Sequence, residues 1–68
     1  VEMAAFIKED IDLVKMSFRS KGNIRVNDFA STFFHGGGHI NAAGGRSELS
    51  FDETVVKFKY SLNIFLNE

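Results

Sequence analysis

Apolar and polar residues alternate along the first part of the chain, which is the pattern of strands that bury one face. Over residues 13–19 polar positions separate the apolar side chains Val14, Met16 and Phe18. Residues 2–8 are also largely apolar and predict a second strand. The polar residues 9–12 lie between the two segments, so the sequence predicts a β-hairpin.

The spacing of apolar residues then changes to that of a helix. Five apolar side chains fall at helical spacing on one face: Val26, Phe29, Ala30, Phe33 and Phe34. Asn27 is the predicted N-cap of this helix, because its short side chain can accept a hydrogen bond from a free backbone amide. We expect the helix to end at the glycines that follow.

A second helix is predicted at the end of the chain. Ser50 and Glu53 have the spacing of a capping box, in which each residue bonds the backbone amide of the other. One apolar face consists of Phe51, Val55, Phe58, Leu62 and Phe65. A weaker apolar set consists of Val56, Tyr60, Ile64 and Leu66. We expect a partner domain, or a second copy of the chain in a homodimer, to cover that second set.

Between the two helices, the residues predict a glycine-rich loop followed by a short strand over residues 46–49. The order is therefore strand, strand, helix, glycine loop, strand, helix. This order predicts a small α/β (α+β) domain in which helices pack on a mixed β-sheet. No proline, repeat or low-complexity segment interrupts it, so residues 1–68 form a single domain.

Composition limits the class of protein. A chain of 68 residues has a small core, and the absence of cysteine excludes disulfides and cysteine-bound zinc as further sources of stability. The net charge of -1 argues against a general nucleic-acid coat protein. No apolar run approaches the 18 residues of a membrane span, so we expect a soluble, cytoplasmic protein without a membrane partner.

Five of the six glycines lie in one segment, GGGHINAAGG, at residues 36–45. Consecutive glycines let backbone amides converge on an anion, and His39 could add a further donor to a phosphate. Alternatively, the glycines only end a helix and allow a close reversal of the chain. The spacing matches neither a dinucleotide-binding motif nor a P-loop. The residues alone leave both interpretations open.

Three segments together resemble a known family. The strand SFRSK at residues 17–21, the helix VNDFASTFF and the segment GGGHINAAGG resemble the DHH-associated C-terminal domain of DHH phosphoesterases, over nearly the full chain. The resemblance is greatest to the nano-RNase and phosphoadenosine-phosphate phosphatase branch. Other members are single-strand exonucleases of the RecJ type and cyclic-dinucleotide phosphodiesterases.

The resemblance implies a substrate-binding role. Gly36, Gly37, Gly38 and His39 would contact a substrate phosphate, and Arg19 would bind a further phosphate of a nucleotide or short oligonucleotide. The parent enzyme would be a Mn²⁺-dependent hydrolase of short oligonucleotides, an oligoribonuclease, or of 3′,5′-nucleoside bisphosphates.

The resemblance also implies that this chain is part of a longer protein. The two Mn²⁺ ions and the catalytic residues would belong to an N-terminal DHH domain that this sequence lacks. The two histidines, His35 and His39, have no acidic neighbour with which to form a two-metal site. We therefore expect no catalytic residue, no metal ligand and no activity in this fragment alone.

Other interpretations stay open. The chain could be a binding module for nucleic acid or a cyclic dinucleotide without chemistry of its own. Asn41 is predicted to support the loop through bonds to the backbone, and His35 to cap the preceding helix. Phe6 and Phe18 are the aromatic residues on strands that could stack on a base, and both are expected to be buried.

Overall fold

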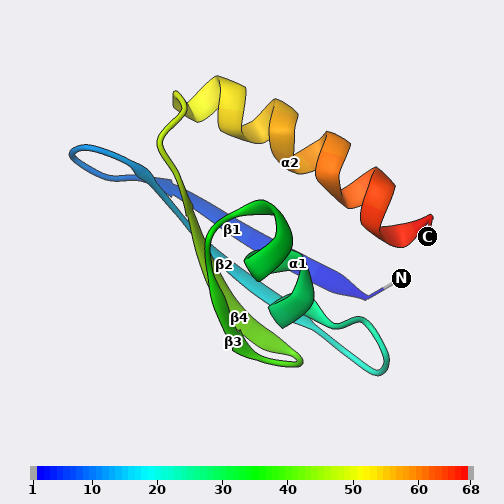
Figure 1. Cartoon of the computed structure of the whole chain (residues 1–68). Helices are drawn as coiled ribbons and strands as arrows, with labels where there is room; N and C mark the ends of the chain where they lie inside the picture. The colour runs from blue at the N-terminus through cyan, green and yellow to red at the C-terminus, as the bar shows by residue number, and fades with distance from the viewer. Residues whose placement is uncertain (1, 68) are drawn as a thin grey trace.

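Two strands precede each of the two helices along residues 2–67, the part of the chain that this computed structural model describes (Figure 1). The elements are β1 (Met3–Glu9), β2 (Val14–Ser20), α1 (Val26–Phe33), β3 (Gly37–His39), β4 (Ala42–Ser47) and α2 (Phe51–Leu66). The predicted α+β class is confirmed, and the predicted hairpin is formed by β1 and β2.

The four strands form one sheet in the order β1-β2-β4-β3, and every neighbouring pair is antiparallel. The prediction of a mixed sheet is therefore wrong. The physical reason is the reversal at Ile40 and Asn41, which joins β3 to β4 as a hairpin and brings β4 back beside β2. A parallel pair would instead need a longer crossover.

The glycine segment also differs from its prediction. We expected a loop at these residues and a strand over 46–49, whereas the glycines contribute β3 and much of β4. Glycine has little preference for strands, so its presence argued for a loop. Pairing of β4 with both β2 and β3 overrides that preference, and such pairing is not visible in local sequence.

Both helices pack on one face of the sheet (Figure 1). The buried core residues are Val14, Met16, Phe18, Val26, Phe29, Ala30, Phe34 and Ala43. Phe18 of β2 lies at its centre, with its ring edge-on to Phe29 of α1 at 5.2 Å and stacked on Phe58 of α2 at 6.2 Å. The predicted alternation of β2 is confirmed, because Val14, Met16 and Phe18 are all buried.

The two helices begin in different ways. The predicted capping box of α2 is present, since the Glu53 amide donates to Ser50 Oγ and the Ser50 amide donates to Glu53 Oε1. The predicted N-cap of α1 at Asn27 is wrong. Arg25 occupies the N-cap position, and the Val26 amide donates to the carbonyl oxygen of Ile40 at 2.8 Å. A backbone group of the β3–β4 turn thus satisfies an amide that a side chain was expected to satisfy.

The end of α1 is made by the backbone. His35 has a positive φ of 53°, and the Gly36 amide donates to the carbonyl oxygen of Ala30 at 3.0 Å. This turn satisfies a carbonyl group at the end of the helix. The hydrogen bond uses the Gly36 amide, which we had expected to be free for a ligand.

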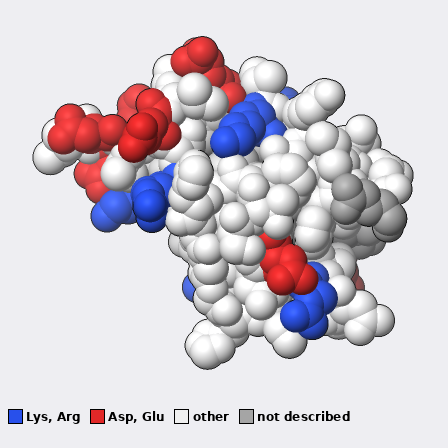
Figure 2. Space-filling view, viewed as in Figure 1, with Lys and Arg blue, Asp and Glu red and all other residues white. Residues whose placement is uncertain are grey.

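The helix-bearing side is largely uncharged. Figure 2 shows few charged side chains over its middle, while acidic side chains gather at the end of the molecule where the β1–β2 turn lies. The second apolar set of α2 is exposed, including Val56 and Tyr60 at 68% and 71%. Neither helix within residues 2–67 has the length and apolar character needed to cross a bilayer.

Candidate functional site

The register of the sheet places Arg19 and His39 on the same face. Arg19 of β2 lies directly opposite Ala42 of β4, and Ala42 lies directly opposite His39 of β3. Residues that are directly opposite in a sheet point to the same side. The side chains of Arg19 and His39 are both exposed, on the side of the sheet that the helices leave free. We call this side, made by the outward residues of all four strands, the open face.

The next row of the open face has very small side chains. Ser17 of β2 lies opposite Gly44 of β4, and Gly44 lies opposite Gly37 of β3. On the other side of Ser17 is Phe6 of β1, which is 65% exposed. This row therefore presents one aromatic ring beside a nearly bare backbone. The prediction that Phe6 is buried is wrong, because the alternation of β1 turns Phe6 away from the core.

A third row of the open face is basic. Lys15 of β2 lies opposite Lys8 of β1 and Arg46 of β4. Together with Arg19, these residues are the four cations among the strand residues that point to this face, and none of those strand residues is acidic. The open face is thus a place where an anion is favoured.

The cations at and near this face differ in their partners. Lys21 pairs with Glu2 at 3.2 Å, Lys15 pairs with Asp10 at 3.2 Å, and Arg25, outside the face, pairs with Asp28 at 2.8 Å. Within residues 2–67, no carboxylate forms a salt bridge with Arg19. The Arg19 guanidinium donates one hydrogen bond, from Nη1 to its neighbour's carbonyl oxygen, Phe18 O, at 3.1 Å. Its other donors remain available to a ligand.

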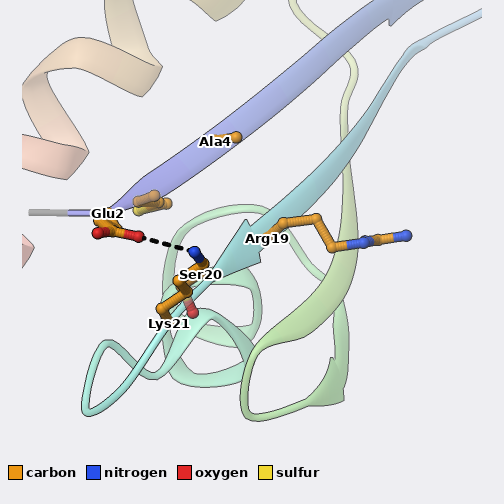
Figure 3. A pocket seen from close by; sticks show the side chains of 6 residues that line it. Glu2, Ala4, Arg19, Ser20 and Lys21 are labelled. Atoms are coloured by element: carbon orange, nitrogen blue, oxygen red, sulfur yellow. Dashed lines mark ion pairs between the residues drawn. The ribbon is translucent and has the colours of Figure 1, made fainter.

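The direction of the Arg19 side chain also leaves its guanidinium donors available to a ligand. Figure 3 shows the side chain leaving β2 across β4, away from the Glu2–Lys21 ion pair. Arg19 also lines a shallow cavity of about 250 Å³ whose other lining residues are Glu2, Met3, Ala4, Ser20 and Lys21. Arg19, Ala42 and His39 lie in one row across β2, β4 and β3.

Three of the glycines are required by packing. A Cβ at Gly36 would overlap the carbonyl group of Gly44, and a Cβ at Gly45 would lie 2.8 Å from the Cβ of Phe34. Gly38 has a φ of +145°, and its added Cβ would lie 2.7 Å from the carbonyl oxygen of Ala42. The structural interpretation of the glycine segment therefore accounts for these three residues.

Gly37 and Gly44 are different. A Cβ at Gly37 would meet no atom within 4 Å, and one at Gly44 would only make ordinary contact with the Met16 carbonyl oxygen at 3.4 Å. Neither glycine has the positive φ that disfavours other residues. The fold would therefore accept a side chain at both positions. Their lack of one keeps the open face bare and lets a ligand approach the backbone closely.

The backbone of the glycine segment is extended. Gly37–His39 form an edge strand, so their amides do not converge in the concave arrangement that the anion-binding interpretation required. An edge strand leaves alternate amide groups without a partner in the sheet. An anion at this end of the face could therefore accept a hydrogen bond from an edge amide, beside the His39 side chain.

Asn41 links two loops near Arg19 and His39. Its Nδ2 lies within hydrogen-bond distance of Ser20 Oγ at 2.9 Å and of the carbonyl oxygens of Gly22 and Ile24, each at 3.3 Å. The Ser20 amide donates to the Asn41 carbonyl oxygen at 3.1 Å. These bonds tie the β3–β4 turn to the loop that follows β2, so they fix the ends of the two strands that carry Arg19 and His39.

The described residues do not supply a metal site. Within residues 2–67, no three His, Cys, Asp or Glu side chains are grouped so that they could hold a metal ion. The donor set of these residues does not fit a Mn²⁺ centre. The arrangement on the open face is suited to binding and orienting an anion.

Comparison with known proteins places this arrangement in a family. The family model of the DHHA1 domain matches residues 1–65. The chain belongs to the DHHA1 domain family. This finding confirms the resemblance at the level of the DHH-associated domain.

The DHHA1 domain also matches a solved structure. A crystal structure of an exopolyphosphatase-related protein from Bacteroides fragilis has a TM-score of 0.89 and 38% sequence identity, over 96% of the present chain. The match covers 19% of that protein, so the present chain spans about a fifth of its length. Among curated protein sequences, none matches the chain significantly.

Some residues of the open face could not be recognised from the sequence. Lys8 and Arg46 were not predicted as parts of a site, because their alignment with Lys15 depends on the register between strands. Phe6 was named as a possible stacking residue but was expected to be buried, whereas the alternation of β1 turns it away from its apolar neighbours.

Proposed function

We propose that this DHHA1 domain is the substrate-binding part of a metal-dependent phosphodiesterase or phosphatase that hydrolyses short oligonucleotides or 3′,5′-nucleoside bisphosphates. The observation that carries the proposal is the placement of Arg19 and His39 on either side of Ala42, on a face with four cations and no acid among its strand residues. Membership of the family supports the phosphoester class of substrate.

Each residue has a role in this proposal. The planar guanidinium of Arg19 can donate two parallel hydrogen bonds to oxygens of one phosphate. His39 can donate a hydrogen bond from its ring to a phosphate oxygen. Because neighbouring strands are spaced by about 4.8 Å, the Cα atoms of Arg19 and His39 are about 10 Å apart. That separation suits two long side chains that hold one phosphate or two successive phosphates.

The glycines complete the proposed binding site. Gly36 and Gly38 fix the path of β3, as their steric surroundings require. Gly37 leaves space for the ligand, because nothing lies within 4 Å of the position of its absent side chain. Asn41 is a positioning residue, since it holds the turns at the ends of the strands that carry Arg19 and His39.

Catalysis would reside elsewhere in the protein. In this proposal an N-terminal DHH domain of the same protein would hold Mn²⁺ and supply the hydrolytic chemistry, and the DHHA1 domain binds and orients the phosphate. The cytoplasmic location and the homodimer also stay predictions.

The test uses the full-length protein with Mn²⁺, with a dinucleotide and a 3′,5′-nucleoside bisphosphate as substrates. We expect Arg19→Ala and His39→Ala to raise KM about tenfold or more, in keeping with the loss of charge-assisted hydrogen bonds. Arg25→Ala is the matched control, because Arg25 is an exposed arginine that already pairs with Asp28. Unchanged KM in both site variants would refute the proposed site.

The same experiment separates the alternative function. If the wild-type protein binds the dinucleotide in an Arg19-dependent manner but hydrolyses neither substrate, the domain is a binding module without chemistry of its own. If it hydrolyses only one of them, that result selects between the two substrate classes.

A further inference from the structure

Phe6 is an isolated aromatic residue on the open face. Its side chain is 65% exposed, although exposure of a large apolar side chain to water is unfavourable. It lies directly opposite Ser17, in the row that continues through Gly44 to Gly37. No bulky side chain from those three positions shields either the ring or the space beside it.

The surroundings of Phe6 differ from those of the exposed apolar residues on α2. Val56, Tyr60 and Ile64 follow one another at helical spacing and form a continuous apolar stripe, as in a protein interface. Phe6 instead has Ala4 and Lys8 as its neighbours on the same side of β1. A single ring among cations and bare backbone is suited to a flat ligand that also carries negative charge.

The position of Phe6 relative to Arg19 defines that ligand further. Phe6 pairs with Ser17, and Arg19 is two residues along the same strand and on the same face. Diagonal neighbours of this kind are about 7–8 Å apart between Cα atoms, within reach of aromatic and long side chains. The Arg19 side chain extends across β4, away from β1 (Figure 3), so a ligand held at its phosphate by Arg19 would span β2 to place a planar group on the Phe6 ring.

We propose that Phe6 stacks on a nucleobase of the substrate whose phosphate is held by Arg19. This inference rests on the proposed function and deepens it, because it makes the base part of what is recognised. Stacking of a base on an aromatic side chain needs no particular hydrogen-bond pattern, so every base is accepted. The site would thus distinguish a nucleotide from an inorganic polyphosphate, while reading little of the base identity.

The experiment is a binding cycle on the full-length protein. The probes are a dinucleotide and the same compound without its bases, and the variants are Phe6→Ala, Phe6→Trp and Arg19→Ala. Tyr60→Ala is the matched control, because Tyr60 is an aromatic residue of α2 with similar exposure, 71%. Melting temperatures of all variants establish that each is folded.

We expect Phe6→Ala to weaken binding of the dinucleotide by about 5- to 100-fold, the range for removal of one stacked aromatic. The abasic compound should bind the wild-type protein and the Phe6→Ala variant equally, because it has no base that could stack on residue 6. Phe6→Trp should retain or improve dinucleotide binding. Tyr60→Ala should leave binding of both probes unchanged.

Two results would overturn the inference. Equal losses for both probes in Phe6→Ala would mean that the ring acts through the structure of the face, not through the base. Unchanged dinucleotide binding in Phe6→Ala, with a loss in Arg19→Ala, would remove the stacking role and leave the phosphate site standing. Unchanged binding in both variants would instead refute the proposed function itself.

Discussion

Arg19 of β2 and His39 of β3 lie on the same side of the sheet, with Ala42 of β4 directly between them. The two residues are twenty positions apart in the chain, and the antiparallel pairing of three strands brings them together. Because Ala42 has only a methyl group, no bulky side chain from β4 separates Arg19 from His39.

The space above Ala42 can be tested by placing a charge there. Ala42→Glu would put a carboxylate between Arg19 and His39, where it competes with a phosphate for both donors. Under the proposed function, we expect KM of the full-length protein to rise about tenfold or more, with little change in melting temperature. Thr32→Glu adds the same charge at an exposed position of α1 and should leave KM unchanged. A normal KM in the Ala42 variant would exclude binding between the two residues.

The glycines of β3 should separate into two classes. The added methyl group of Gly37→Ala meets no atom within 4 Å, so we expect the unfolding free energy to change by no more than about 0.5 kcal/mol. The same methyl group should weaken substrate binding. Gly38→Ala requires an alanine at a φ of +145° and 2.7 Å from the Ala42 carbonyl oxygen, so we expect a loss of about 2 kcal/mol or more. Urea unfolding and substrate titration of both variants measure the difference. Equal stability of the two would contradict the steric assignment.

Asn41 is expected to act on binding through the position of the loops. Asn41→Ala removes bonds to Ser20, Gly22 and Ile24, so we expect a loss of about 1 kcal/mol and faster amide exchange over residues 21–25. Asn41→Asp should lower stability and speed amide exchange more than Asn41→Ala does, because a carboxylate cannot donate to the two carbonyl oxygens. Hydrogen exchange followed by mass spectrometry measures the effect. Exchange that is unchanged in both variants would mean that these bonds do not hold the loop.

A buried hydroxyl pair joins α2 to the sheet. Thr54 Oγ1 donates to Ser47 Oγ at 2.8 Å, and both side chains are buried. Thr54→Val keeps the shape but removes this donor, so we expect a destabilisation of about 1–2 kcal/mol. Thr54→Ser keeps the hydroxyl group and separates loss of the hydrogen bond from loss of the methyl group. Urea unfolding measures both, and a Thr54→Val variant as stable as the wild type would show that the pair contributes nothing.

Asp10 gives the β1–β2 turn a dependence on pH. The hydrogen bond from the Ile11 amide, followed by the charge and hydrogen bond of Lys15, lowers the pKa of the Asp10 carboxyl below its usual value. A lowered folded pKa stabilises the fold above the pKa of the unfolded chain, about 3.9, and this contribution is lost as pH falls through the folded value. Asp10→Asn should therefore be less stable than the wild type at pH 7, and the difference should shrink at pH 2–3. An equal difference at both pH values would contradict this linkage.

The parts of the fold that sequence could predict are those set by local pattern. The alternation of β2, the aromatic face of α1 and the capping box of α2 each depend on residues within a few positions of one another. The start of α1 was mispredicted, because the carbonyl group that accepts its first amide belongs to Ile40, fourteen positions further along the chain. The strand β3 was missed for the same kind of reason, since glycine gains strand structure only from its partner.

The candidate site shows the same division. Arg19 could be assigned to an outward position from alternation alone, and the glycine segment and His39 from the resemblance to the family. Their common face, and the distinction between Gly37 and its neighbours Gly36 and Gly38, required the register and the steric surroundings. Sequence could also not show that a basic row lies on that face.

The segregation of both helices to one side of the sheet has a practical consequence for protein engineering. Side chains at positions 4, 6, 8 and 17 point to the open face and are exposed, so their replacement should leave the aromatic core untouched. Surface substitutions of this kind usually change stability by no more than about 0.5 kcal/mol. A combinatorial library over these four positions could therefore be selected for new anionic ligands while the scaffold itself is retained.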